Sequence, residues 1–202
     1  MKKGRNIKRD IEVLFEIGTF RYLDRVWKQF LNMGVANCAE HSFRVAWVAL
    51  TLARYEKDVD FEKLLKMALV HDLAESRTGD VNYISRQYTK RMESEAVSDI
   101  FKNTSHDNEM IEICKEYEER KSLEAKIVKD ADTIDVDLEL QELSSKGSSL
   151  GRLWKKHRKE FVYPKIYTKM AKKFWSEIVK ADPHDWHVKS SKNRFNGGDW
   201  KR

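Results

Sequence analysis

Glycine, proline and cysteine are scarce in this sequence, and it has no long apolar run. Its 202 residues include 8 glycines, 2 prolines and 2 cysteines. An all-β sandwich or barrel needs many turns rich in glycine and proline, so this composition argues against that class. Two cysteines, Cys38 and Cys114, are too few for a disulfide framework and are typical of a reducing compartment. No apolar stretch approaches the ~18 residues of a membrane span, and the basic N-terminus lacks the apolar segment of a signal peptide. We therefore expect a soluble, cytoplasmic protein without a membrane partner.

The net charge of +6 is spread unevenly along the chain. Residues 1–10 carry a net +4, residues 11–149 a net −8 and residues 151–202 a net +10. An acidic body can hold a metal ion, whereas basic ends can meet phosphate or keep a protein in solution. The length allows one domain with a sizeable core. We expect residues 1–181 to form this domain and residues 182–202 to form a basic, flexible tail.

Helical periodicity is frequent and strand-like alternation is nearly absent, so the predicted fold class is all-α, a single compact helical bundle. The first predicted helix runs from about Asp10 to Phe30. Asn37 and Glu40 have the spacing of a capping box and predict a helix that continues to about Tyr55. The segment SSKGSSLG, residues 144–151, is predicted to be a loop. Further helices are expected over about 60–73, 88–102 and 108–119, from about 122 onward, and over 164–180.

Four side chains stand out as candidate metal ligands: His41, His71, Asp72 and Asp132. Two neutral imidazoles and two carboxylates give a mixed donor set of formal charge −2, which offsets a divalent cation. Such a set suits Mn, Fe, Co, Ni or Zn better than the all-oxygen sites that Ca and Mg prefer. Four protein ligands leave positions for water and substrate, and a metal-bound water becomes more nucleophilic near neutral pH. Glu75, four residues after His71, would share its helix face and could orient that water or pass a proton.

These residues lie in stretches that resemble the HD-domain metal-dependent phosphohydrolases, and within them the 5'-deoxynucleotidase branch. HDxxE followed by TGD, with EHS upstream and KDADxxD downstream, is much more specific than the HD pair alone. The resemblance runs from about Gly18 to Phe174. The matching stretches are AEHSFRVAWVA at 39–49, LVHDLAESRTGDV at 69–81 and LEAKIVKDADTIDVDLELQEL at 123–143.

The resemblance implies roles for individual residues. The four candidate ligands fall on the family's metal positions, and Glu75 falls on its catalytic acid/base position. Asp80 falls on a second acidic position near the substrate sugar and the metal-bound water. The family also places an Arg-Trp pair upstream of the first histidine, with the arginine on the phosphate and the tryptophan near the sugar. Trp27 has a matching spacing but follows a valine, so Arg25 is the nearest candidate for the phosphate contact, ahead of Arg21. The resemblance further implies one divalent metal ion per subunit, from Mn, Co, Fe, Ni, Zn or Mg, and a homodimer.

Other interpretations of these residues stay open at this stage. Trp27 lies on an apolar row, so core packing is as good an explanation as sugar contact, and Asp80 could simply cap a turn. Asp130, Asp135 and Asp137 surround Asp132. We expect most of these three to be solvated and one to support a ligand from behind. Cys38 is expected to be a small buried or loop residue, and a non-functional tail is the simpler interpretation of His184 and His187.

The leading functional hypothesis is hydrolysis of a (deoxy)nucleoside 5'-monophosphate to nucleoside and phosphate. A second hypothesis keeps the site but changes the substrate to a triphosphate, an alarmone or a cyclic dinucleotide. Alarmone hydrolases have the pattern HDxxED at the second motif, whereas here Ser76 follows Glu75. The GYP signature of cyclic-dinucleotide enzymes is also missing. These absences favour the monophosphatase.

A third hypothesis is a nucleic-acid-binding module with a vestigial site. The net +10 of residues 151–202 and the basic run WKKHRKE at 154–160 motivate it. A solvated helix face explains the same run more simply. A nucleotide is therefore the expected partner, and nucleic acid is not.

Overall fold

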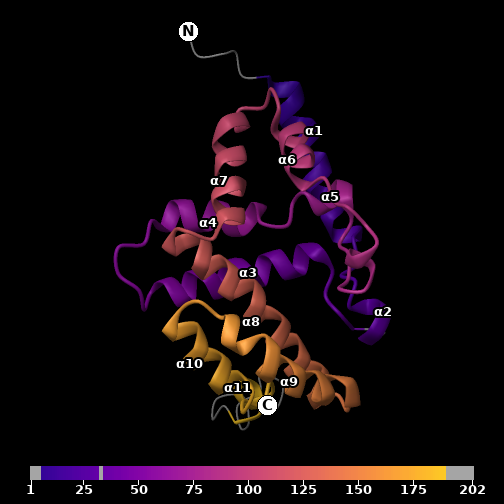
Figure 1. The fold of residues 1–202 in the computed structure, drawn as a ribbon, viewed down its shortest axis with the longest axis vertical. Helices are drawn as coiled ribbons and strands as arrows, with labels where there is room; N and C mark the ends of the chain where they lie inside the picture. Colours follow the sequence, from indigo (N-terminus) through magenta and orange to yellow (C-terminus); the bar gives the residue numbers. More distant parts are fainter. Residues whose placement is uncertain (1–5, 32–33, 190–202) are drawn as a thin grey trace, which may run out of the picture.

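Helices, and no β-strands, make up the regular structure of residues 6–31 and 34–189, which the computed structural model describes (Figure 1). The predicted all-α class is confirmed. The division into a domain and a tail stays a prediction, because residues 190–202 lie outside the described ranges. The α-helices are α1 (Ile7–Thr19), α2 (Lys28–Leu31), α3 (Cys38–Ala53), α4 (Phe61–Val70), α5 (Glu75–Thr78), α6 (Glu93–Phe101), α7 (Asp107–Glu119), α8 (Leu123–Ser145), α9 (Ser149–Phe161), α10 (Lys169–Ile178) and α11 (Asp185–Val188). Three short 3₁₀ turns are η1 (Phe20–Tyr22), η2 (Ser85–Gln87) and η3 (Tyr163–Lys165).

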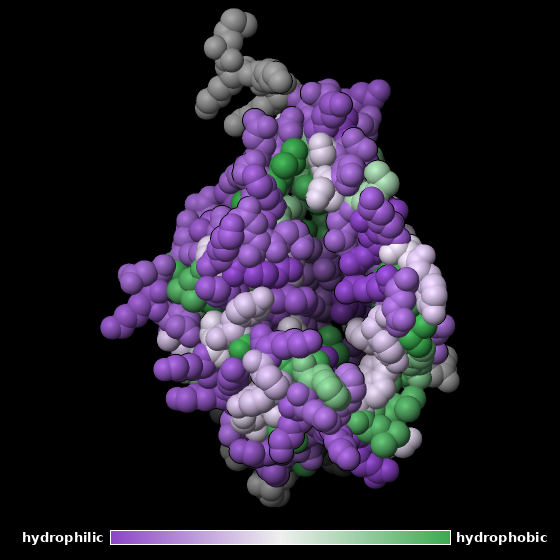
Figure 2. Space-filling model, in the orientation of Figure 1, coloured by the Kyte–Doolittle hydropathy of each residue, from purple (hydrophilic) through white to green (hydrophobic). Residues whose placement is uncertain are grey.

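The core forms where α3, α4 and α8 pack together, and α8 also contacts α7, α9 and α10 (Figure 1). Each of the three central helices buries an apolar stripe, as helical periodicity predicts. None of the described helices is long and apolar enough to cross a bilayer. The face drawn in Figure 2 is largely hydrophilic and is recessed near its middle. The buried stripes include Val45, Ala49 and Leu52 of α3, Leu64, Met67 and Ala68 of α4, and Ile127, Ala131 and Ile134 of α8.

The predicted capping box opens α3. The Asn37 side chain accepts a hydrogen bond from the Glu40 N–H at 2.9 Å, and the Glu40 carboxylate accepts one from the Asn37 N–H at 3.0 Å. Both bonds satisfy N–H groups that a helix start otherwise leaves unpaired. The cap therefore fixes the first turn of α3, which carries His41.

The single helix predicted from Asp10 to Phe30 is wrong. α1 ends at Thr19, η1 follows, and Leu23 has extended backbone. The Cys38 N–H donates to the Leu23 carbonyl at 2.9 Å, and Asp24 forms an isolated antiparallel bridge with Asn37. These long-range bonds outweigh the local helical preference. They carry residues 23–27 across the start of α3 and bring Arg25 to the interior.

Helix α9 begins at Ser149, inside the segment predicted to be a loop up to Gly151. Gly151 is buried where α9 meets α8. A Cβ at this position would lie 2.6 Å from Ser144 Oγ and 2.9 Å from the Leu140 carbonyl oxygen. The absence of a side chain therefore allows the close approach of the two helices. Two other predicted helices start later than expected, at Glu93 and at Lys169, each after a short 3₁₀ turn.

Replacing Gly151 by alanine should destabilise the protein by about 1–3 kcal/mol, because the added methyl group overpacks the α8–α9 contact. Thermal unfolding followed by circular dichroism measures the effect. Gly18→Ala is the matched control, since a Cβ on Gly18 meets nothing within 4 Å. Equal melting temperatures for the two variants would contradict the close α8–α9 contact.

Candidate metal centre

The structure brings the four candidate ligands together: one donor atom from each lies within 4.8 Å of the others. His41 comes from the start of α3, His71 and Asp72 follow α4, and Asp132 lies in α8. His41 Nε2 is 3.4 Å from Asp72 Oδ2 and 3.3 Å from Asp132 Oδ1, and His71 Nε2 is 3.2 Å from Asp72 Oδ2. Separations near 3 Å are those of neighbouring ligands around an ion that binds each at ~2.0–2.2 Å.

Both imidazoles are oriented as ligands. His71 Nδ1 lies 2.9 Å from the Ala68 carbonyl oxygen, which can only accept, so Nδ1 carries the proton and Nε2 keeps its lone pair. His41 Nδ1 lies 2.6 Å from Asp135 Oδ2, a carboxylate that favours the same tautomer. The Nε2 atoms of both rings are buried and have no hydrogen-bond partner among the described residues. A metal ion between these atoms would satisfy both, so the donor set fits a divalent cation.

Charge around His41 favours its protonated form when no metal is present. Burial disfavours the charged ring, but the neighbouring carboxylates of Asp132, Asp135 and Asp72 raise its pKa well above the usual value. Burial also disfavours the Asp132 carboxylate, yet Lys129 and His41 hold its pKa well below the usual range. A metal ion must therefore displace a proton from His41 but none from Asp132.

Metal affinity should fall as pH is lowered. Because the ion binds the neutral His41 ring and the pKa of this ring is raised, protons compete from a higher pH than they would for an ordinary histidine. Below that pKa we expect the apparent affinity for Mn²⁺ to fall about tenfold for each pH unit. Isothermal titration calorimetry between about pH 8 and pH 6 measures it. An affinity that does not change with pH would contradict the assignment of His41 as a ligand.

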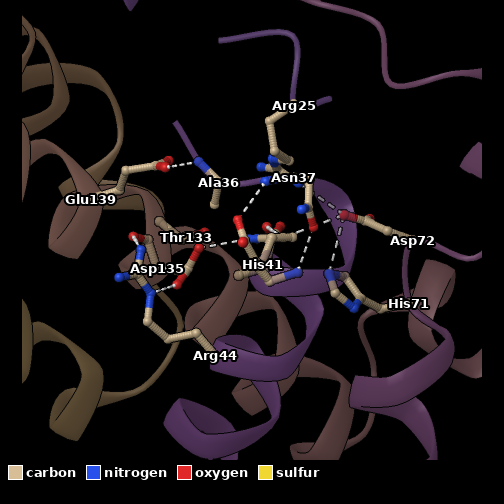
Figure 3. Close-up of polar contacts among 12 residues, drawn as sticks. Arg25, Ala36, Asn37, His41, Arg44, His71, Asp72, Thr133, Asp135 and Glu139 are labelled. Carbon is tan, nitrogen blue, oxygen red and sulfur yellow. Dashed lines mark hydrogen bonds and ion pairs between the residues drawn. The ribbon is translucent and has the colours of Figure 1, made fainter. Parts of the chain in front are cut away.

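Three further aspartates of α8 are buried, contrary to the expectation that most would be solvated. Asp130, Asp135 and Asp137 are only 1%, 1% and 3% exposed. Asp130 accepts two backbone N–H bonds, both at 2.8 Å, from the segment before α10. Asp137 receives a forked pair of bonds from Arg158. Asp135 lies between His41 and the guanidinium of Arg44, as Figure 3 shows. Of the three, Asp135 has the position of a residue that supports a metal ligand.

The Asp135→Asn substitution should weaken Mn²⁺ binding by about 10- to 100-fold, because the amide is a poorer acceptor for the His41 Nδ1–H. Equilibrium dialysis measures the affinity. Asp130→Asn is the matched control: it is equally buried on the same helix, but its bonds go to backbone groups away from the cluster. The control should cost stability and leave metal affinity unchanged. A similar affinity in both variants would refute the role of Asp135.

Glu75 reaches the cluster although α4 does not continue to it. The helix ends at Val70, and the Glu75 N–H donates to the Asp72 carbonyl at 2.9 Å in a tight turn before α5. Glu75 Oε1 lies 3.3 Å from Arg91 Nη1, while Oε2 is buried without a partner among the described residues. Burial, with the nearby charges of Asp72 and Asp80, raises the pKa of Glu75 to about 9. A carboxyl group that keeps its proton at neutral pH can act as a proton donor.

The segment before α2 places residues that are predicted to bind the substrate beside the metal cluster. Arg25 is buried, and its Nη1 donates to Asp72 Oδ2 at 3.2 Å. Asp80 Oδ2 accepts the Val26 N–H at 3.0 Å and lies 3.8 Å from Arg25 Nε. Asp80 thus holds the Arg25 segment as well as facing the site. Arg21, the second candidate for phosphate, is exposed.

Two cavities reach the cluster. The smaller, of about 220 Å³, has Arg25, Trp27, Asp80 and Asp132 among its lining residues. The larger, of about 670 Å³, is lined by His71 and several arginines and acidic residues. Asp72 and Glu75 line both. Asp72 and Glu75 are therefore accessible to a ligand from either cavity.

A model of the HD domain family (HD_3) matches residues 17–179. The chain belongs to the HD domain family. Curated relatives include the 5'-deoxynucleotidase HDDC2 of Dictyostelium discoideum, 32% identical over 127 residues that cover 56% of this chain and 67% of the relative. The HDDC2 of Danio rerio is 30% identical over 136 residues, which cover 63% of this chain and 67% of that protein.

Solved structures agree with the HD-domain fold. A conserved hypothetical protein from Pyrococcus furiosus superposes with a TM-score of 0.71 at 25% identity and covers 85% of this chain and 99% of its own. A structure titled as a predicted metal-dependent phosphohydrolase, from Magnetospirillum magnetotacticum, has a TM-score of 0.68 at 22% identity and covers 86% and 91%. The second likeness shows the fold alone. The resemblance seen in the sequence is thus confirmed at the level of the family.

Cys38 lies close to Glu75 and Asp80 in this HD domain, which its position in the sequence does not predict. Its Sγ forms a second close group with a carboxylate oxygen each of Glu75 and Asp80, all within 4.8 Å. The residue is fully buried at the start of α3, as expected of a small packing residue. Burial raises the pKa of its thiol, which therefore stays protonated. A protonated thiol is a poor nucleophile and a poor metal ligand.

Proposed function

We propose that this HD domain is a metal-dependent phosphomonoesterase that hydrolyses (deoxy)nucleoside 5'-monophosphates to nucleoside and phosphate. The observation that carries the proposal is the convergence, beside a cavity, of two carboxylates and two imidazole Nε2 atoms that have no hydrogen-bond partner among the described residues. The relatives named 5'-deoxynucleotidase support the substrate class.

Each residue has a distinct task in this proposal. His41, His71, Asp72 and Asp132 would hold one divalent metal ion, which when bound offsets phosphoryl charge and makes a bound water more acidic. Glu75, with its raised pKa, gives a proton to the leaving 5'-oxygen. Arg25 offers its guanidinium to a phosphate oxygen beside Asp72. Trp27 lines the cavity where the sugar would lie, and Asp80 keeps Arg25 in place and faces the sugar.

A second candidate function is hydrolysis of a nucleotide that carries more than one phosphate. The larger cavity favours it, because it lies beside His71 and its wall includes Arg86, Arg91, Arg120 and Lys129. These cations could hold further phosphate groups on the far side of the cluster.

Phosphate release tests both functions. A panel of ribo- and deoxyribonucleoside 5'-mono- and triphosphates is assayed with Mn²⁺, Co²⁺ or Mg²⁺, before and after chelation. We expect release from monophosphates that stops on chelation and returns with the metal. Release from triphosphates alone would favour the second function. No metal-dependent release from any nucleotide would refute both.

We also propose that the protein is a homodimer in the cytoplasm. One side of α1 exposes Ile7, Ile11, Leu14 and Phe15, and an exposed apolar row of this kind often marks a protein interface. Two free cysteines fit a reducing compartment. Light scattering of the full chain should give twice the 23.9 kDa subunit mass. A monomer mass at micromolar concentration would contradict the dimer.

A further inference from the structure

One row of side chains on helix α9 lies beside the smaller cavity. Trp154, Arg158 and Val162 are spaced four residues apart, so they project from one side of the helix and its end. Trp154 packs edge-on against Trp27, with ring centroids 5.1 Å apart. Arg158 and Val162 line the cavity itself. The segment that carries the basic run therefore forms a wall of the site.

Arg158 is fixed in this wall. Its Nε and Nη2 donate to the two carboxylate oxygens of Asp137 at 2.6 and 2.7 Å, and Nη2 also donates to the Thr133 carbonyl at 2.7 Å. The side chain is only 11% exposed. Its Nη1 makes no hydrogen bond to any described residue. A rigid guanidinium that keeps one nitrogen free is preorganised to donate to a ligand in the cavity.

Arg158 bonds to other residues than the cations nearest the metal cluster do. Asp137, which anchors it, follows Asp132 by five residues on α8, or ~7.5 Å along the helix axis. Two other cations, Arg25 and Lys129, already lie at hydrogen-bond distance from Asp72 and Asp132. Arg158 is thus anchored on α8 by Thr133 and Asp137, on the C-terminal side of Asp132, whereas Arg25 and Lys129 bond to carboxylates of the cluster itself.

Part of the cavity beside Arg158 suits a flat ring. Most of the lining residues are polar, but Trp27, Tyr83, Val136 and Val162 supply aromatic and aliphatic surface. Aromatic and aliphatic walls with one or two convergent donors are typical of pockets that bind a nucleobase. The acceptors on a base edge are ring nitrogens and carbonyl oxygens, which pair well with a guanidinium N–H.

We propose that Arg158 is a specificity-determining residue that donates from Nη1 to an acceptor on the nucleobase. The proposal rests on the proposed function, since it takes the phosphate of a 5'-monophosphate to lie at the metal cluster. The proposal assigns a binding role within the site to one residue of the basic run at 154–160. Lys156 and Lys159 of the same helix remain on the exposed side.

The Arg158→Lys variant tests this inference. Lysine keeps the positive charge and can still pair with Asp137, but it lacks a nitrogen equivalent to Nη1. The assay compares kcat/KM for nucleoside 5'-monophosphates with kcat/KM for 2-deoxyribose 5-phosphate, which has no base. We expect the variant to lose about 10- to 100-fold on at least one nucleotide and to keep its rate on the sugar phosphate. Lys159→Gln is the control on the same helix and should change neither.

A second variant separates a base contact from loss of structure. Asp137→Asn loosens the anchor of Arg158 but keeps its guanidinium, so it should reduce nucleotide kcat/KM less than Arg158→Lys does. The melting temperature and Mn²⁺ affinity of each variant are measured alongside. An equal loss on nucleotides and on 2-deoxyribose 5-phosphate would overturn the base contact.

Failure of the inference can be told apart from failure of the proposed function. If the wild type hydrolyses nucleotides and 2-deoxyribose 5-phosphate equally well, the proposed function stands and the base contact is wrong. If no monophosphate is hydrolysed, the proposed function fails, and calorimetry with free nucleosides decides the inference. Binding that Arg158→Lys weakens by about tenfold would then support it, and binding that is absent or unchanged in the variant would overturn it.

Discussion

Replacing Asp132 by asparagine should lower metal-dependent phosphate release by on the order of 10³-fold or more. The change removes one of two carboxylate ligands and leaves a donor set of charge −1, which no longer offsets a divalent cation. Both the bound metal and its effect on the phosphoryl group should be lost. Phosphate release and metal content per subunit, measured by plasma mass spectrometry, check the prediction together.

Asp130→Asn is the control for this experiment, because Asp130 lies two residues earlier on α8 and bonds to backbone N–H groups instead. It should keep both metal and activity. If Asp132→Asn retained full activity and a full complement of metal, the assignment of Asp132 as a ligand would be wrong.

Glu75→Gln should lower kcat by about 10²- to 10⁴-fold and leave the metal content unchanged. Glutamine has nearly the same shape and can still accept a bond from Arg91, but it has no carboxyl proton to give. Since the pKa of Glu75 is raised, its proton is present at neutral pH and is lost as the pH rises through that pKa. The wild type should therefore lose activity on the alkaline side, and the residual activity of Glu75→Gln should lack this limb.

Glu93→Gln provides the matched control for Glu75. Glu93 also pairs with Arg91, at 2.7 Å, but is not among the residues that gather around the metal cluster. Its substitution should change kcat little. A Glu75→Gln variant with wild-type kcat and pH profile would show that another group moves the proton.

Local sequence signals predict the metal cluster and the helix starts that carry it. The HDxxE and KDADxxD spacings indicate three of the four candidate ligands and Glu75, and EHS indicates His41. The cap at Asn37 is encoded within four residues, as is the Ser122 side chain that caps α8. Such features depend on contacts only a few residues apart, so periodicity and capping rules capture them.

Long-range contacts account for what the sequence does not reveal. The break after Thr19 depends on bonds between residues 23–24 and 37–38, which no local pattern reports. Asp135 lies among charged residues that look solvated, yet its partners His41 and Arg44 come from α3. Arg158 belongs to a basic run, and its bonds to Asp137 and Thr133 of α8 hold it inward. One signal was available: Asp135 and Asp137 interrupt the apolar stripe of α8, where a charge must find a partner.

Anomalous scattering from crystals grown with Mn²⁺ tests the central claim most directly. We predict one strong manganese peak per subunit, with His41 Nε2, His71 Nε2 and a carboxylate oxygen each of Asp72 and Asp132 at about 2.0–2.3 Å. A peak between Cys38, Glu75 and Asp80 instead, or no peak at saturating Mn²⁺, would contradict the account.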